Sequence, residues 1–421
     1  MPLRRTQPNH PGRSARSPGQ TGQLAYNPVN WQLPQLNASS RRGVQNLWFC
    51  GCNGQPLAAI ANSGTGGSGA SGSGGGGSGG GGSRGAASSS HAPIIVKGRR
   101  TPTVDIHAHC YFQSALNLMG EEAAAVLPPV KGVPEHFLQY EQQLSARFRA
   151  MDLMGIDMQV LSINPFWYRK DRDTAQAICQ IQNENLAELC ATAPKRLAAF
   201  ASLPMQFPDL AVQMLEDAVR RLGLKGAAIG GSVAGRDFSH PEFQPVLAKA
   251  QELGVMLFIH PQSTPELAAR FKGNGWLSNV IGNPLDTTIA LQKLIFEGVF
   301  DRLPHLKVLG AHGGGFLGSY APRMDRSCYV SPQNCDPSIV LQKRPTEYIR
   351  QIYFDSLVFT GEALRHLVAE VGSSQIMIGT DHPIPWEENP VGHVMNTPEL
   401  SDGDRIAILG GNAIRILGLN L

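Results

Sequence analysis

Apolar residues follow two alternating patterns from about residue 101 to the C-terminus. Short, nearly continuous apolar runs alternate with longer stretches in which apolar residues recur every three or four positions. The first pattern is typical of buried parallel strands, and the second of amphipathic helices. The apolar runs are 103–107, 158–163, 197–203, 226–230, 255–259, 306–311, 352–355 and 375–379. The helical stretches are 174–192, 208–222, 242–253, 287–299, 361–371 and 404–417.

Eight strand-like runs alternating with helices over roughly 320 residues predict an α/β fold, a closed (β/α)8 TIM barrel. An open, doubly wound sheet is the alternative. Its phosphate-binding fingerprint is missing, because Gly313-Gly-Gly315 follows a histidine and lacks the full Gly-x-Gly-x-x-Gly spacing. The barrel is therefore favoured.

The chain before residue 96 shows no sustained periodicity. Residues 1–62 are rich in Pro, Asn, Gln, Ser and Arg, so we expect a disordered basic leader. Residues 63–95 form a linker, of which 63–90 is almost pure Gly and Ser, a composition that behaves as a flexible coil. The predicted organisation is a leader, a linker and one barrel domain over 96–421, and the barrel should keep its activity without residues 1–95.

Charge is distributed unevenly along the chain. Ten Lys and Arg residues precede Asp105, whereas no Asp or Glu does. The remainder carries 26 basic and 33 acidic residues, so its net charge is about −7 although the whole chain is at +3. The excess positive charge of the whole chain therefore comes from the leader, and we expect no nucleic-acid partner for the barrel.

The cysteines and the hydropathy pattern bear on location. Seven irregularly spaced cysteines do not describe a disulfide framework. We expect the five in the barrel region to be reduced thiols of a cytoplasmic protein. They are Cys110, Cys179, Cys190, Cys328 and Cys335. No apolar run approaches the roughly 18 residues of a membrane span, so no membrane partner is expected. The Arg- and Ser-rich leader keeps organelle targeting open as an alternative.

Residues able to bind a metal close four of the predicted strands. His107 and His109 close the first run, His260 the fifth, His312 the sixth and Asp381 the eighth. One histidine at a strand end is more often a hydrogen-bonded structural residue than a ligand. Barrel active sites, however, lie at the C-terminal ends of the strands, so the joint placement of these five residues predicts a site. Side chains two apart along a strand share a face, which puts the first two histidines side by side.

Three imidazoles and one carboxylate bind a divalent ion and leave one position open. The set suits Zn²⁺, with Mn²⁺ or Fe²⁺ as alternatives. Such an ion lowers the pKa of a coordinated water to about 7. The remaining histidine, His312, can act as both acid and base, because the ordinary imidazole pKa is near 6.5. The fourth run, Gly226-Ala-Ala-Ile-Gly-Gly231, ends without a lysine or an acid for a second metal, so one ion is expected.

Five motifs of the barrel region together resemble one enzyme family. They are Asp105-Ile-His-Ala-His109, Leu203-Pro-Met-Gln206, Phe258-Ile-His-Pro261, Ala311-His-Gly-Gly-Gly315 and Gly379-Thr-Asp-His-Pro383. From about residue 103 to the C-terminus, the chain resembles the aminocarboxymuconate-semialdehyde decarboxylase branch of the amidohydrolase superfamily, the amidohydrolase 2 type. The leader has no counterpart there.

The resemblance implies a one-metal barrel in which His107, His109, His260 and Asp381 bind the ion. It also implies that His312 moves protons beside Asp381 during catalysis. Members of the branch remove CO₂ from aromatic or unsaturated carboxylic acids without an organic cofactor. Two routes stay open: addition of water to a conjugated substrate, or protonation of a ring carbon, before CO₂ leaves.

The resemblance further implies that Arg323 binds the substrate carboxylate in a neighbouring subunit, and hence a homodimer or higher homo-oligomer. The planar guanidinium suits a carboxylate, although a surface helix arginine is the alternative. The chain departs from the branch in its first long loop. Between Cys110 and Ala146 it has Lys131 and no arginine, where the branch has a second substrate-binding arginine. This difference argues against aminocarboxymuconate semialdehyde as the substrate.

Three aromatic residues after the second run, Phe166, Trp167 and Tyr168, are predicted to wall a pocket for a flat ring, with packing under a loop as the alternative. His382 replaces a tyrosine of the branch and is expected to support Asp381. The predicted function is a metal-dependent, organic-cofactor-independent decarboxylase of a small aromatic or muconate-like carboxylic acid. A metal-dependent hydrolase of an ester, lactone or carbon–carbon bond is the alternative. A structural metal in a non-catalytic barrel is less favoured, because structural zinc sites are normally closed.

Overall fold

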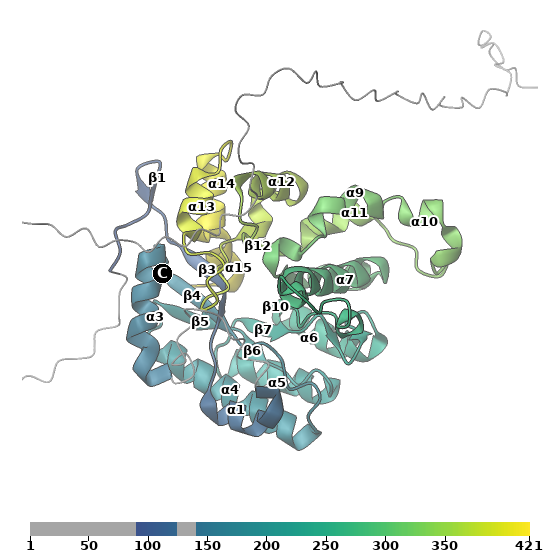
Figure 1. Cartoon of the computed structure of the whole chain (residues 1–421), viewed down its shortest axis with the longest axis horizontal. Helices are drawn as coiled ribbons and strands as arrows, with labels where there is room; N and C mark the ends of the chain where they lie inside the picture. Colours follow the sequence, from purple (N-terminus) through teal and green to yellow (C-terminus); the bar gives the residue numbers. More distant parts are fainter. Residues whose placement is uncertain (1–89, 124–139) are drawn as a thin grey trace, which may run out of the picture. The chain divides into compact units, whose positions relative to one another are not determined.

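The computed structural model describes residues 90–123 and 140–421. Within them, eight parallel strands lie at the centre of a ring of helices (Figure 1). In barrel order the strands are β3 (Val104–His109), β4 (Met158–Ser162), the interrupted β5 (Leu197–Ala199) and β6 (Ala201–Ser202), β7 (Gly226–Ile229), β10 (Met256–Ile259), β11 (Lys307–Gly310), β12 (Tyr353–Asp355) and β13 (Ile376–Met377). Each overlaps a predicted run, and the (β/α)8 barrel is confirmed.

The barrel closes between its first and last strands. Strands β3, β4 and β5 are hydrogen-bonded in one sheet. A second sheet has the order β6-β7-β10-β11-β12-β13. The chain passes from β5 to β6 through Phe200, whose backbone N–H donates to the carbonyl of Leu161 at 2.8 Å. Parallel bridges join Asp105 to Ile378 and Ala108 to His382. This seam places the residues after β13 beside the end of β3.

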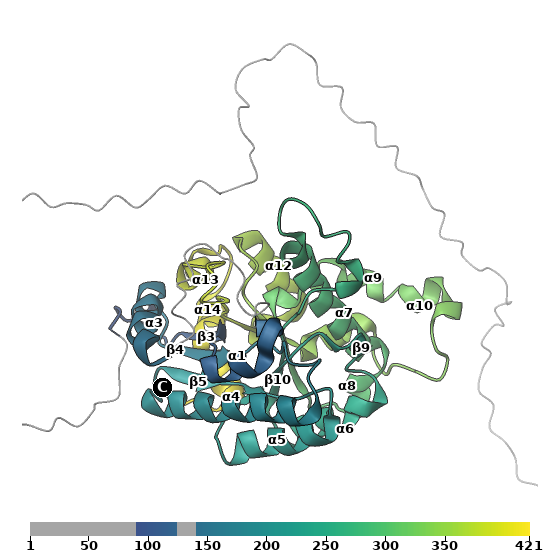
Figure 2. The ribbon, with the colours of Figure 1, turned by 60° about the horizontal axis from the view of Figure 1, so that its bottom comes forward.

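Helices cover the outside of the barrel (Figure 2). Those that connect successive strands include α3 (Tyr140–Met154), α4 (Arg172–Thr192), α5 (Pro208–Arg220), α6 (Gln244–Leu253), α7 (Asn283–Phe296) and α12 (Gly361–Val371). All but α3 overlap a predicted helix. The Asp171 carboxylate caps α4 by accepting the backbone N–H of Thr174 at 3.0 Å. None of the described helices combines the length and the apolar character needed to span a membrane.

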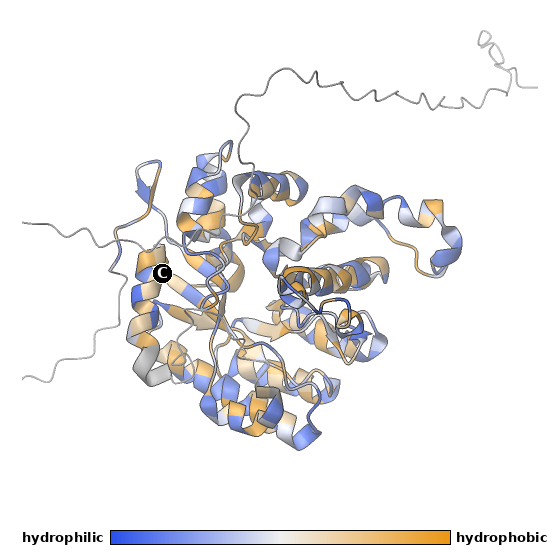
Figure 3. Ribbon diagram, in the orientation of Figure 1, coloured by the Kyte–Doolittle hydropathy of each residue, from blue (hydrophilic) through white to orange (hydrophobic). Residues whose placement is uncertain are grey.

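The strands are buried along most of their length, and much of the central ribbon has the orange of hydrophobic residues (Figure 3). Inside the barrel, Ile106, Val160, Phe200 and Phe258 belong to one buried cluster. The C-terminal helix α15 (Asn412–Leu417) contributes to the same cluster, together with residues at the starts of β3 and β4. It therefore covers the end of the barrel opposite to the strand ends that carry the histidines.

The helix predicted over 404–417 is interrupted. It consists of α14 (Asp402–Ile406), a π-helical turn (Ala407–Gly411) and α15. A Cβ atom at Gly410 would lie 2.3 Å from the carbonyl oxygen of Pro102. The turn thus brings the backbone at Gly410 into direct contact with the strand segment that precedes β3, which only glycine permits.

Several elements were not predicted. They are the hairpins β1 (Ile95–Val96) with β2 (Arg99–Arg100) and β8 (Ser232–Val233) with β9 (Arg236–Asp237), and the short helices α1 (Gln113–Met119), α8 (Val299–Arg302), α9 (Ala321–Met324), α10 (Ser327–Val330), α11 (Pro345–Tyr348) and α13 (Pro390–Asn396). Residues 318–344, here called the arm, include α9 and α10, and α10 projects from the barrel in both views (Figures 1 and 2). The predicted leader 1–62 and most of the linker 63–95 lie outside the described residues.

Two of the five cysteines expected as thiols form a disulfide. Cys328 and Cys335 are bonded, with Cα atoms 5.8 Å apart, across a loop of the arm. The expectation is wrong for this pair, because a separation of seven residues does not reveal that α10 and the following turn reverse the chain. The three others are free. Burial raises the pKa of the Cys110 thiol to about 12, which makes it unreactive.

Candidate metal centre

The first two site histidines come from an irregular end of β3. The pairing of β3 with β4 changes register between Asp105 and Ala108, which is a bulge in the strand. His107 lies within this irregular segment and His109 just after it, and their Nε2 atoms lie 3.1 Å apart. The predicted proximity of the two rings is observed.

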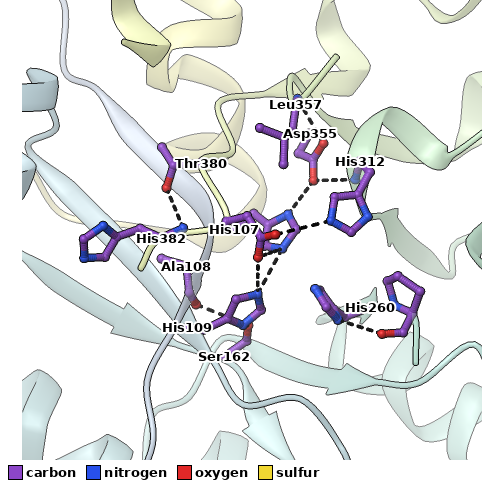
Figure 4. Close-up of polar contacts among 12 residues, drawn as sticks. His107, Ala108, His109, Ser162, His260, His312, Asp355, Leu357, Thr380 and His382 are labelled. Carbon is purple, nitrogen blue, oxygen red and sulfur yellow. Dashed lines mark hydrogen bonds and ion pairs between the residues drawn. The ribbon is translucent and has the colours of Figure 1, made fainter. Parts of the chain in front are cut away.

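Asp381 and His260 complete a buried cluster. Its three histidine side chains lie close together in Figure 4. His260 follows β10, and the Asp381 backbone N–H donates to the carbonyl of His107 across the seam at 2.8 Å. Oδ1 of Asp381 lies 2.8 Å from Nε2 of His109 and 3.3 Å from Nε2 of His107. One ligand atom from each of the four side chains lies within 4.8 Å of the others. The structure thus brings together all four residues expected to bind the ion.

Each histidine of the cluster has its Nδ1 atom in a hydrogen bond that points away from the centre. The partners are Oδ2 of Asp355 for His107 (2.6 Å), Oγ of Ser162 for His109 (3.1 Å) and the carbonyl of Pro261 for His260 (3.1 Å). A proton on Nδ1 leaves the Nε2 lone pair facing the centre. Nε2 of His260 is buried without a hydrogen-bond partner.

These residues fit one divalent cation. Lone pairs on neighbouring Nε2 atoms repel each other unless a cation or a proton lies between them. Burial opposes a charge on His107, but Asp381 and Asp355 raise its pKa to about 10, so the surroundings of this ring stabilise positive charge. Burial and the neighbouring imidazoles lower the pKa of His260 well below its ordinary value. A divalent ion would supply the positive charge and could be held by all four ligand atoms.

Asp355 is a site residue that sequence analysis missed. Its Oδ2 atom meets Nδ1 of His107, and its two oxygens also accept the backbone N–H groups of His312 (2.8 Å) and Gly313 (2.7 Å). Burial works against its charge, but these bonds and the His107 charge lower its pKa below the ordinary value. The run 352–355 ends in this carboxylate, so the strand-end rule that selected His260 would also have found it.

His312 lies beside the cluster without being part of it. Its Nε2 atom is 3.6 Å from Oδ2 of Asp381, and its side chain is 14% exposed, whereas that of His107 is fully buried. His312 and Asp381 both have left-handed backbone conformations, with φ of 55° and 61°. Such conformations are uncommon outside glycine and gather at functional sites. His312 is therefore held beside the cluster, where it lines a small cavity of about 110 Å³ together with Asn279, Asn283 and Trp386.

The three glycines after His312 serve packing. Their φ values are 61°, 75° and 66°, which favour glycine. A Cβ at Gly313 would meet Val358 at 2.4 Å, and one at Gly315 would meet the carbonyl oxygen of Pro284 at 2.0 Å. Protein atoms fill the space that the missing side chains leave, so the glycines let the backbone pack closely.

A cavity of about 190 Å³ opens onto the cluster. Its lining residues are His109, His260 and Asp381, the apolar Tyr111, Phe166, Trp276 and Ile384, and the polar Asn164, Gln262, Ser263, Ser278, Asn279 and Asn283. Phe166 therefore walls the pocket as predicted. No lysine or arginine is among these described lining residues. The side-chain oxygen of Asn164 is buried without a hydrogen-bond partner.

Trp167 does not line the site, which corrects the prediction that paired it with Phe166. Its side chain has no exposed surface, and its indole N–H donates to the carbonyl of Leu203 at 3.0 Å. Tyr168, the third of the predicted aromatic residues, is buried and is not among the described residues that line the cavity at the cluster. It borders a neighbouring cavity of about 310 Å³, and its hydroxyl accepts the backbone N–H of Gly230 at 3.2 Å.

Two further predicted residues lie outside the cavity of the described chain. Arg323 is exposed on α9 of the arm and is not among the cavity's lining residues. The ring of His382 points away from the cluster (Figure 4). His382 contributes through its backbone, because its carbonyl accepts the N–H of His109 at 2.6 Å.

Known proteins share this fold and sequence pattern. The amidohydrolase family profile matches residues 104–419. A 2-amino-3-carboxymuconate-6-semialdehyde decarboxylase of Dictyostelium discoideum is 35% identical over 278 residues, which are 65% of this chain and 76% of that protein. A gamma-resorcylate decarboxylase of Rhizobium radiobacter is 29% identical over 290 residues, 65% of this chain and 86% of its own.

A solved structure adds a metal to the comparison. The dihydroxybenzoic acid decarboxylase of Polaromonas, with bound manganese and the inhibitor 2-nitroresorcinol, superposes with a TM-score of 0.66 at 26% identity. The match covers 76% of this chain and 98% of that one.

Proposed function

The chain belongs to the amidohydrolase family, and from this membership we propose that it is a metal-dependent decarboxylase of an aromatic carboxylic acid. The observation that carries the proposal is the buried cluster of His107, His109, His260 and Asp381, which opens into a cavity walled by aromatic rings. Similar proteins named as decarboxylases of aromatic or muconate acids support it.

The cavity favours a hydroxylated aromatic acid with one carboxylate. A muconate-like substrate with two carboxylates needs two cationic partners, whereas the described lining of one chain offers only the place for a metal, so such a substrate would depend on a cation from a second subunit. The unpartnered oxygen of Asn164 needs a hydrogen-bond donor, and a phenolic hydroxyl provides one. A flat ring also fits between Phe166 and the opposing loop that carries Trp276.

When bound, the ion supplies positive charge that orients the carboxylate and an adjacent oxygen of the substrate. Phe166 confines the ring, and His312 delivers a proton from Nε2 to the ring carbon that carries the carboxylate. As the bond between that carbon and the carboxylate breaks, its electron pair remains with the ring and CO₂ departs. The carboxylate of Asp381 lies 3.6 Å from Nε2 of His312, close enough to orient the imidazole.

For the resident ion we propose Zn²⁺, with Mn²⁺ and Fe²⁺ as alternatives. Three imidazole nitrogens and one carboxylate oxygen support zinc. The manganese bound in the Polaromonas relative supports the first alternative. Elemental analysis of protein purified without chelators distinguishes them.

We also propose that the active form is a homodimer or higher homo-oligomer in which Arg323 of one subunit reaches the substrate of another. Exposed apolar residues on the arm support an interface there: Tyr329 and Val340 are each 80% exposed. Light scattering gives the oligomeric state. Arg323→Ala should raise KM for the acid without changing metal content.

The proposed location is the cytoplasm, with organelle targeting by the leader as the alternative. The disulfide of the arm gives the alternative weight, because stable disulfides are rare in reducing compartments. Imaging of a fluorescent protein fused after residues 1–89 tests the leader.

A screen of hydroxybenzoates and muconates for released CO₂ tests the decarboxylase. A hydrolase acting through the same site is the second candidate, and it would incorporate oxygen from labelled water into an ester or lactone product without releasing CO₂. Release of CO₂ from a hydroxybenzoate supports the proposal, and hydrolysis without CO₂ refutes it.

A further inference from the structure

A chain of buried hydrogen bonds connects α3 with the seam of the barrel. Arg147 on α3 donates from Nη1 to Oε1 of Gln159 at 2.9 Å, and Nε2 of Gln159 donates to Oδ2 of Asp105 at 2.9 Å. The hydroxyl of Thr380 donates to the same Asp105 oxygen at 2.6 Å. All four side chains are buried, and none belongs to the metal cluster.

The same four residues hold the backbone of the metal-binding segments. Oδ1 of Asp105 accepts the N–H of His107 at 3.1 Å and the N–H of Thr380 at 3.2 Å. Nη2 of Arg147 donates to the carbonyl of His109 at 2.5 Å. The network thus contacts both histidine positions of β3 and the residue that directly precedes Asp381.

Asp105 is the acceptor in every bond that this network makes to it. Its oxygens face four donors, and the Thr380 hydroxyl that donates to it also accepts the backbone N–H of His382 at 3.1 Å. A carboxylate with no exposed surface is costly unless a positive charge or hydrogen bonds compensate it. Arg147 supplies that charge through Gln159, whose amide can accept from the guanidinium and donate to the carboxylate at once.

We propose that Arg147 and Gln159 are positioning residues for the metal ligands. They fix the side chain of Asp105 through the Gln159 amide, and Asp105 keeps the His107 and Asp381 segments in register across the seam. The proposal rests on the proposed metal binding. Interrupting the network lets the two segments shift relative to each other. Metal binding is then weaker, although all four metal-binding side chains are still present.

Arg196 offers a matched control. It is also a buried arginine near the start of β4, but its side chain bonds Asp157 and Asp152 and makes no bond to the described segments that carry the metal ligands. Its Nε donates to the carbonyl of Asp157 at 2.8 Å, and its Nη2 donates to Asp152 at 2.8 Å. Replacing either arginine with methionine removes a buried guanidinium of the same size, whereas only Arg147 contacts the metal-binding segments.

The test measures Mn²⁺ affinity and thermal unfolding of the metal-stripped full chain for wild type, Arg147→Met, Gln159→Leu and Arg196→Met. Loss of hydrogen bonds that support metal ligands typically costs roughly 10- to 100-fold in metal affinity. We expect that loss for Arg147→Met and Gln159→Leu. Arg196→Met should lower the Tm of the metal-stripped protein yet bind Mn²⁺ within about twofold of wild type. Arg147→Lys, which keeps the charge but not the two-pronged donor, should recover part of the affinity.

The outcomes distinguish a failure of the proposed positioning role from a failure of the proposed metal binding. If Arg147→Met and Gln159→Leu bind Mn²⁺ as wild type does and differ only in Tm, the network is structural and the inference is overturned. If Arg147→Met fails to fold, Gln159→Leu decides by the same criterion. If wild type itself binds no divalent metal, the proposed function fails first.

Discussion

Oδ2 of Asp355 lies 2.6 Å from Nδ1 of His107, and neither side chain has any exposed surface. The contact joins the ends of β12 and β3. A carboxylate that accepts from Nδ1 fixes the ring's tautomer and directs Nε2 at the metal position. Asp355 also accepts the N–H of His312, so one carboxylate orients both a metal ligand and the proposed proton donor.

Asp355→Asn should weaken metal binding roughly 10- to 100-fold while the protein stays folded. The amide retains the size of the side chain but loses the charge that holds the His107 proton on Nδ1. Competition with a fluorescent chelator measures the affinity. Asp301→Asn is the control, because it alters a carboxylate bound to the Tyr348 hydroxyl away from the cluster. Equal affinities of Asp355→Asn and wild type would contradict the orienting role.

Phe166 and Trp167 are neighbours with different expected roles. Phe166→Ala should raise KM roughly 10-fold, because losing its contact with the ring costs about 1–2 kcal/mol. Trp167→Phe should leave KM unchanged and lower the free energy of unfolding by about 1–3 kcal/mol, since it removes a buried N–H···O bond and some core volume. Steady-state kinetics and urea unfolding check the pair. The reverse pattern would place Trp167 in the site.

Asp286 should make the protein less stable above pH 6. Burial raises the pKa of this carboxyl from 3.8 to about 6, so between these values the folded state binds more protons than the unfolded state. Stability therefore falls as pH rises through that window, and the full cost, up to about 3 kcal/mol, applies above it. Asp286→Asn can keep the bond from the Gln262 N–H. Its Tm should match wild type near pH 4 and exceed it at pH 8; a constant difference would refute the assignment.

Deletion of residues 1–89 should leave activity and Tm unchanged, whereas deletion of 1–95 should lower Tm. The second deletion removes His91, whose Nε2 lies 3.3 Å from Asp157, and Ile94, which packs against the core. Equal Tm values for both truncated chains would support the predicted boundary at residue 95, whereas a lower Tm for the longer deletion alone would move the boundary to residue 89. Differential scanning calorimetry of both truncated chains decides the boundary.

Much of the barrel and site could be predicted because burial on both faces leaves a plain signal. Runs such as 255–259 are apolar throughout, and a histidine that ends one stands out. The barrel geometry then brings strand ends together, although His107 and Asp381 are far apart in sequence. Asp355 also ends one of the predicted apolar runs, 352–355, so the same strand-end signal is present in the sequence.

Other features depend on contacts that local patterns do not encode. Phe166 and Trp167 are adjacent aromatic residues of one loop, and only the fold shows that one faces the cavity and the other the core. The Cys328–Cys335 bond depends on how the arm turns. Arg147 looks like an ordinary helix arginine until its bonds to Gln159 and His109 are seen.

The most direct test titrates Mn²⁺ or Zn²⁺ into metal-stripped protein while CO₂ release from a carboxyl-labelled hydroxybenzoate is followed. Wild type should gain activity until about one ion per chain is bound, as the single four-ligand cluster requires. His260→Ala should need a large excess of metal. His312→Ala should bind one ion as tightly as wild type but release CO₂ at least about 100-fold more slowly, as expected for loss of a general acid. Metal-independent CO₂ release, or loss of metal binding in His312→Ala, would contradict the account.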